Sequence, residues 1–148
     1  MINVLVVTRG HAFAHDAFLG MLDALEDVDA TLVQHPAAQA VLSASNADRW
    51  DAVLFYDMCG IPGLGSFDDA DSDGRPSQAY VDAIEALLER GTGLVLLNHA
   101  CVQWPNWPRW REISGSSFML TEGELWGETV PGSGYRGAHG PLPNATER

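Results

Sequence analysis

The feature that most constrains the fold is an alternation between short apolar runs and segments with helical periodicity. The apolar runs are residues 2–7 (INVLVV), 30–34 (ATLVQ), 51–57 (DAVLFYD) and 93–98 (GLVLLN). Runs of this length that are rich in β-branched residues predict strands. The uninterrupted apolar character of residues 2–7 is typical of a strand that is buried on both faces of a parallel sheet.

Segments with helical spacing of apolar residues separate these predicted strands. Helices are expected over residues 16–26 and 77–90, with Gly91 ending the second, and a brief one within residues 37–45. A long loop rich in Gly and Asp is expected over residues 58–76. The apolar residues expected to be buried are Phe18, Met21, Leu22 and Leu25 in the first helix and Val81, Ile84, Leu87 and Leu88 in the second.

Strands that alternate with helices predict right-handed βαβ units and a mostly parallel sheet covered on both faces. The 148 residues are enough for one such domain. The predicted fold is therefore α/β, a flavodoxin-like three-layer sandwich, with the strands in the order second, first, third, fourth. In sheets of this kind, ligands bind at the carboxyl ends of the strands, beside the point where the strand order reverses.

Polar residues follow three of the predicted strands. His11 follows the first strand, Asp57 ends the third and His99 follows the fourth. Each of these alone could be a helix cap or a solvated side chain. Because the predicted order makes the three strand ends neighbours, we expect them to face one crevice and to form the reactive cluster.

This cluster admits two kinds of chemistry. Two imidazoles and a carboxylate from His11, Asp57 and His99 could bind zinc or another divalent metal and leave a position open. The same side chains could instead transfer protons without a metal, because an unperturbed histidine has a pKa of about 6.5. We favour acid–base chemistry, and no cofactor is certain.

The segment QWPNWPRW (residues 103–110) holds three tryptophans in eight residues. Indole faces stack on the C–H surface of sugar rings, but the same rings could instead pack against one end of the sheet, with each proline fixing a turn. We expect packing for two of them and ligand contact for Trp104, which lies nearest to His99. Arg9 is expected to anchor a polar group of the ligand.

Composition limits the partners and the compartment. Lys and Arg number 8 and Asp and Glu number 20, so the formal net charge is −12. Such a surface repels phosphate backbones and anionic lipids, so neither a nucleic acid nor a membrane is an expected partner. Two cysteines make no disulfide framework and no apolar run approaches a membrane span, so a cytoplasmic location is expected.

Five stretches of the chain together resemble one known family. They are VLVVTRGHAFAHDAF, HPAAQA, WDAVLFYDM, GTGLVLLNHACVQWPNWPRWREISGSSF and VPGSGYR, and they extend to Arg136. In this order they are similar to the trehalose-utilisation (ThuA-like) family, which is related in fold to class I glutamine amidotransferases. The resemblance implies a role in carbohydrate metabolism, with trehalose, a related disaccharide or a keto-sugar as the small-molecule partner.

The resemblance also bears on single residues. Gly10, His11 and Asp16 match the first family motif, and Tyr56 with Asp57 matches the end of the third strand, which implies that Gly10 and Tyr56 bind the substrate. The stretch SGSS departs from a more glycine-rich family pattern, and Asn98 stands where many relatives have a second histidine. The remaining matches are His99, Trp104, Pro105 and Trp107.

The sequence around Cys101 argues against glutamine hydrolysis. That reaction needs a cysteine on a glycine-flanked elbow directly after the strand, activated by a histidine. Here the stretch reads LLNHACV, so His99 occupies the turn and no glycine flanks Cys101. We expect a buried and unreactive cysteine, and a protein that is not a glutamine amidotransferase.

The end of the chain departs from the family. Relatives continue for several dozen residues, whereas here a polar tail, GAHGPLPNATER, covers residues 137–148. We therefore expect a shortened ThuA-like domain over residues 1–136, with residues 116–127 supplying one strand or hairpin. An exposed sheet edge or apolar face would follow, and with it self-association as a homo-oligomer or marginal stability. The alternative function is a non-catalytic ligand-binding module or an inactive remnant.

Overall fold

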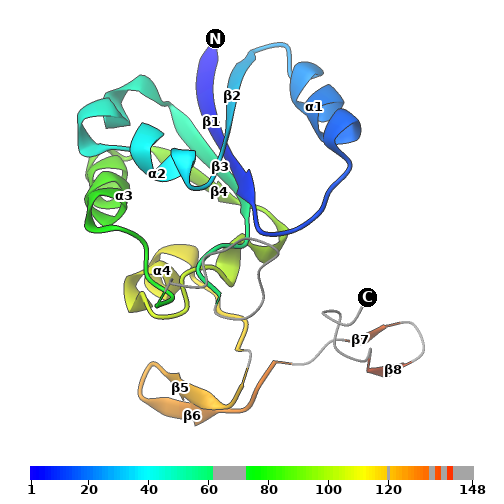
Figure 1. Cartoon of the computed structure of the whole chain (residues 1–148), viewed down its shortest axis with the longest axis vertical. Helices are drawn as coiled ribbons and strands as arrows, with labels where there is room; N and C mark the ends of the chain where they lie inside the picture. Colours follow the sequence, from blue (N-terminus) through cyan, green and yellow to red (C-terminus); the bar gives the residue numbers. More distant parts are fainter. Residues whose placement is uncertain (62–72, 120, 134–135, 138–139, 142–148) are drawn as a thin grey trace.

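The computed structural model describes residues 1–61, 73–119, 121–133, 136–137 and 140–141, and a four-stranded sheet lies at its centre (Figure 1). All neighbouring strands of this sheet are parallel, and their order is β2-β1-β3-β4, as predicted. The α/β class is therefore confirmed, and the arrangement is consistent with a flavodoxin-like layout. The strands are β1 (Ile2–Arg9), β2 (Val28–Gln34), β3 (Ala52–Asp57) and β4 (Gly93–Leu96).

Helices lie on both faces of the sheet (Figure 1). One face is covered by α1 (His15–Asp23), and the opposite face by α2 (Ala37–Val41) and α3 (Gln78–Arg90). The ends of α3 follow ordinary capping rules, because the Ser77 side chain accepts a hydrogen bond from the Tyr80 amide and Gly91 has a left-handed φ of 76°. The remaining helices are the 3₁₀ helix η1 (Ala44–Arg49), the 3₁₀ helix η2 (Asn98–Cys101) and α4 (Pro108–Ser114).

Strand β1 is buried on both faces, as its apolar run predicts. Its side chains alternate between two cores: Val4 and Val6 pack with Leu22 of α1, while Leu5 and Val7 belong to the larger core on the other face. The larger core also holds Phe55, Ile84, Leu87 and Trp110, each fully buried. The core on the side of α2 and α3 is thus the larger of the two.

Two predicted elements are shorter than expected. Helix α1 ends at Asp23, before Leu25. Of its predicted apolar face, Leu22 is buried and Phe18 partly buried, while Met21 and Leu25 are 45% and 47% exposed. Strand β4 ends at Leu96, because Asn98 adopts a φ of 53° and turns the chain into η2.

The segment after α4 forms a hairpin apart from the main sheet (Figure 1), and its second strand lies beyond the residues 116–127 from which a strand or hairpin was expected. Its strands are β5 (Gly123–Leu125) and β6 (Glu128–Val130), and the short strands β7 (Arg136–Gly137) and β8 (Gly140–Pro141) also pair. Among the described residues β4 is an edge strand, and its Val95 is 45% exposed.

Two sequence predictions fall partly beyond the described residues. Residues 62–72 of the predicted loop and residues 138–139 and 142–148 of the predicted tail lie outside them. Within the described parts of the chain, no helix combines the length and the apolar character that crossing a membrane requires.

Candidate functional site

Two clusters of titratable side chains lie at the carboxyl ends of the sheet strands. The first, which we call the histidine pair, consists of His11 and His99. The second, which we call the buried trio, consists of His35, Asp57 and Cys59. Both clusters take residues that end a strand or follow one within three residues, at the edge where sheets of this kind bind ligands.

The histidine pair joins the ends of β1 and β4. The His11 and His99 ring centroids are 5.3 Å apart. Tyr56, in β3 between them, meets the His11 ring edge-on at 4.6 Å. All three side chains are half-buried. The structure thus brings together two of the three residues predicted to be catalytic, with a residue predicted to bind substrate.

One ring nitrogen of each histidine in the pair lacks a hydrogen-bond partner within the described residues. His11 Nδ1 lies 3.3 Å from the carbonyl of Ala12, but His11 Nε2 and His99 Nδ1 are buried atoms without a partner among the described residues. Burial lowers the pKa of His99 below 6.5, and a positive charge on His11 lowers it further. His99 is therefore biased toward the neutral imidazole, which can accept a proton.

Aromatic rings border the pair on the side of α1. Phe13 lies 5.3 Å from Tyr56, and Phe18 of α1 stacks on Tyr56 at 4.7 Å. Phe13 also contacts the edge of the His11 ring at 6.1 Å. His11 therefore lies against a largely apolar wall, which strengthens any polar contact made there.

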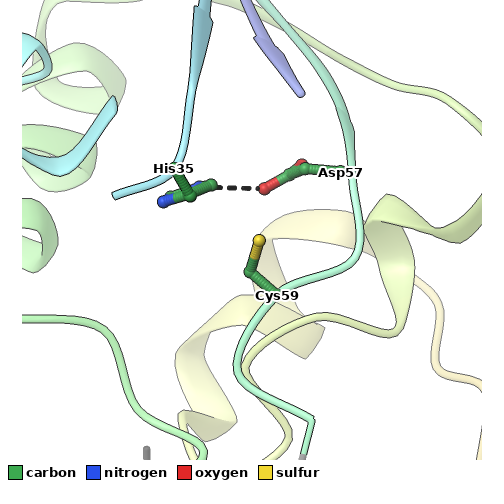
Figure 2. Close-up of side chains that lie close together, drawn as sticks. All are labelled: His35, Asp57 and Cys59. Carbon is green, nitrogen blue, oxygen red and sulfur yellow. Dashed lines mark hydrogen bonds and ion pairs between the residues drawn. The ribbon is translucent and has the colours of Figure 1, made fainter. Parts of the chain in front are cut away.

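The buried trio joins the ends of β2 and β3 (Figure 2). His35 Nε2 lies 3.1 Å from the Asp57 carboxylate. Figure 2 shows the Cys59 thiol pointing toward the space between these two groups. One ligand atom of each residue lies within 4.8 Å of the others, and all three residues are buried. These three residues could hold a metal ion.

Burial governs the electrostatics of the trio. It raises the pKa of the Asp57 carboxyl above 3.8, while the hydrogen bond and the charge of His35 act in the opposite direction. Tyr80 is fully buried nearby, and its pKa is raised well above 10.0 by burial and by the charges of Asp57 and Cys59. Buried polar atoms without a hydrogen-bond partner in the described structure include His35 Nδ1, Asp57 Oδ1, Tyr80 OH and Trp104 Nε1.

The alternation of side chains along β3 separates the two clusters. Successive residues of a strand point to opposite faces. Tyr56 therefore points toward α1 and the histidine pair, while Asp57 points toward the larger core and pairs with His35. Asp57 was predicted to act with His11 and His99, and the structure gives it a hydrogen bond to His35 instead. The predicted metal ligands and the observed trio share only Asp57.

The predicted substrate-binding residues have structural contacts of their own. The Arg9 guanidinium donates a hydrogen bond to the backbone carbonyl of His35. Gly10 has a φ of 95°, and a Cβ there would collide with the carbonyl of Met58. Trp104 is only 3% exposed, and its ring lies 5.6 Å from that of His35 and 5.9 Å from that of Tyr80. Trp104 covers the buried trio.

The prediction for the cysteines is wrong in one respect. Cys101 is half-buried, with its thiol 3.7 Å from the carbonyl of Asn98, whereas Cys59 is 4% exposed. The short helix η2 turns at Asn98 and leaves Cys101 near the surface. The sequence reasoning also missed His35, although it follows the second strand as closely as His99 follows the fourth. Applying the same strand-end rule to all four strands would have found it.

No relative of the chain was found among known proteins. No protein-family model, no curated protein and no solved structure matches the chain. The resemblance to ThuA-like proteins, the domain boundary at residue 136 and the carbohydrate substrate therefore stay predictions.

Proposed function

We propose that the histidine pair binds an uncharged sugar or a similar polyhydroxylated compound and transfers protons to and from it. One observation carries this proposal: imidazoles from two strand ends lie 5.3 Å apart, and each has a buried ring nitrogen without a partner among the described residues. Unsatisfied buried nitrogens are costly unless a ligand supplies the missing hydrogen bond.

The chemistry follows from the difference between the two rings. His99, with its lowered pKa, accepts a proton from a substrate hydroxyl. The His11 ring lies beside that of His99, with centroids 5.3 Å apart, and can return a proton through Nε2, which has no partner in the described structure. Such a transfer suits the redox-neutral opening of a hemiacetal sugar ring: His99 takes the proton of the anomeric hydroxyl, the carbonyl forms as the ring C–O bond breaks, and His11 protonates the released ring oxygen. A carbohydrate substrate is what the ThuA-like resemblance implies.

Charge and aromatic character narrow the ligand class. The net charge of −12 disfavours phosphorylated or acidic sugars. Phe13 and Tyr56 place aromatic rings beside His11, where they can pack against the C–H face of a sugar ring. An uncharged disaccharide or keto-sugar fits both features.

Titration of the protein with trehalose and a panel of uncharged disaccharides and keto-sugars tests the proposal. The histidine ring signals are followed by NMR, and any substrate found is then used in a turnover assay. We expect the His11 and His99 signals to shift on binding. His99→Ala should abolish turnover and Cys101→Ser, two residues away, should largely preserve it. Shifts confined to other residues, or loss of turnover in Cys101→Ser alone, would contradict the proposal.

One observation favours a non-catalytic binding module as the second candidate. Among the described residues, neither His11 nor His99 hydrogen-bonds a carboxylate that would orient its ring, because the carboxylate of Asp57 pairs with His35. Catalytic histidines are commonly oriented in that way. Saturable binding of a sugar without any turnover, lost in His99→Ala, would select this candidate.

A further inference from the structure

We propose that the buried trio is a binding site for one divalent transition-metal ion of the zinc type, held by His35 Nε2, a carboxylate oxygen of Asp57 and Cys59 Sγ. The site is separate from the histidine pair and does not rest on the function proposed for it. Three protein ligands leave one position of a tetrahedral ion for water or a ligand.

The three donors already converge. They lie within 4.8 Å of one another, with His35 Nε2 and the Asp57 carboxylate 3.1 Å apart. Bonds of about 2.0–2.3 Å around a tetrahedral zinc ion place its ligand atoms about 3.3–3.8 Å from each other. Small side-chain rotations therefore suffice to form the site, and the strands need not move.

The surroundings hold these donors in place. The Arg9 guanidinium binds the backbone carbonyl of His35 and so fixes the segment that carries the imidazole. Trp104 covers the trio, and Gly60 allows it to do so, because a Cβ at residue 60 would collide with the indole ring. Such preorganisation of the ligands by neighbouring groups is typical of metal sites.

Charge balance favours an ion at this position. A thiolate and a carboxylate from Cys59 and Asp57 carry two negative charges, which a divalent cation neutralises. Asp57 is fully buried, and its Oδ1 atom has no hydrogen-bond partner among the described residues. A buried anionic oxygen without a partner is costly, and a coordinated cation removes that cost.

The protons also balance. In the metal-free protein with a neutral imidazole, Nε2 carries the proton that is donated to Asp57. Binding of the ion breaks the S–H bond of Cys59 and releases that proton to solvent. The ring proton moves from Nε2 to Nδ1, which has no other partner in the described structure. One proton is therefore released for each ion bound, and binding strengthens as the pH rises.

The donor set selects the class of ion. A thiolate and an imidazole suit zinc and cobalt(II), whereas magnesium and calcium prefer sites made only of oxygen. Zinc and cobalt(II) should therefore compete for one site, and millimolar magnesium should leave it unaffected.

The test uses the untagged 148-residue chain, freed of metal with a chelator and titrated with cobalt(II) chloride. We expect one equivalent to bind with a thiolate-to-cobalt charge-transfer band, and zinc to displace it. The chain has two cysteines, so Cys101→Ser is the matched control. The band should persist in Cys101→Ser and disappear in Cys59→Ser, with cobalt affinity reduced at least about tenfold.

The outcome remains decisive even if Cys59→Ser does not fold. A band that persists in Cys101→Ser can come only from Cys59, because no other thiol is left. His35→Gln, checked for folding by circular dichroism, should weaken cobalt binding to a similar degree. Absence of saturable binding to the wild-type protein, or loss of the band in Cys101→Ser, would overturn the proposal.

Discussion

The two clusters at the carboxyl edge of the sheet differ in burial although adjacent residues of β3 contact or belong to them. Tyr56 contacts the half-buried histidine pair, whereas Asp57 belongs to the buried trio. Because side chains alternate along a strand, Tyr56 points toward the smaller core under α1 and Asp57 toward the larger core under α3. The end of one strand therefore contributes side chains to a half-buried and to a fully buried environment, and each environment favours a different chemistry.

The half-buried histidines have ring nitrogens without a hydrogen-bond partner among the described residues, which suits a ligand that binds reversibly. The buried environment pairs an imidazole with a carboxylate and places a thiol beside them, which suits an ion that stays. Gly10 connects the two, because it brings the end of β1 against Met58 at the end of β3. Single substitutions can test whether the two clusters differ in stability and in protonation.

The largest effect is expected from Gly10→Ala, which should disrupt both clusters. Its Cβ would collide with the backbone carbonyl of Met58, and its φ of 95° is unfavourable for alanine. We expect the free energy of unfolding to fall by about 3–5 kcal/mol in urea denaturation, the sum of backbone strain and steric overlap.

Gly91→Ala is the matched control for this variant. Gly91 also has a positive φ, of 76°, but no atom lies within 4 Å of the position of its Cβ. It should lose only about 1–2 kcal/mol, the cost of a left-handed alanine. Equal losses in the two variants would show that the close contact of Gly10 with Met58 is unimportant.

A second variant separates the clusters by stability. In metal-free protein, His35→Ala leaves the buried Asp57 carboxylate without its hydrogen-bond partner, and we expect a loss of about 3 kcal/mol. His99→Ala removes a half-buried ring that makes no ion pair within the described residues, and it should cost about 1 kcal/mol or less. Urea denaturation of both variants measures the difference. A larger loss in His99→Ala than in His35→Ala would mean that the histidine pair, and not the trio, contributes more to the stability of the fold.

Sequence reasoning reached the order of the strands and the meeting of His11 with His99, because both depend on the topology of βαβ units. It did not foresee the hydrogen bond between Asp57 and His35, because it did not consider the alternation of side chains along β3. A strand-end residue can point to either face, and the direction follows from its register against the core. Leu5 and Val7 share the large core with Phe55, and counting from Phe55 gives the face of Asp57.

Other features depend on contacts between distant segments. Trp104 packs over the trio because it has a left-handed φ of 53° and because Gly60, distant in sequence, has no Cβ to collide with its ring. Met21, within α1, and Leu25, beyond its end, are both exposed despite ideal helical spacing. Periodicity predicts which face is apolar, but not which part of that face another element covers.

The pH dependence of stability provides a finer test of the buried trio. The pKa of Asp57 is raised above 3.8 in the folded protein, chiefly by burial. The folded state therefore binds this proton more tightly than the unfolded state does. The stability that results is fully present below pH 3.8 and is lost as the pH rises through the folded-state pKa.

Asp57→Asn, which does not titrate at this position, isolates that contribution. In the presence of a chelator, the free energy of unfolding of the wild-type protein minus that of Asp57→Asn should fall as the pH rises from about 3.8. Urea denaturation at a series of pH values gives the difference directly. A difference that rises with pH would mean that the charge of His35, and not burial, dominates at Asp57.

The smallest effect concerns the histidine pair itself. Burial is the main reason that the pKa of His99 lies below 6.5, and the charge of His11 adds to it. His11→Gln removes that charge but leaves most of the burial, so the pKa of His99 should rise and still remain below 6.5. NMR titration of the His99 ring protons measures the change. His15→Gln, which alters an exposed histidine stacked on Phe13, should leave the His99 titration unchanged. An equal shift in both variants would mean that the general charge near α1, and not the contact between the two rings, sets the protonation of His99.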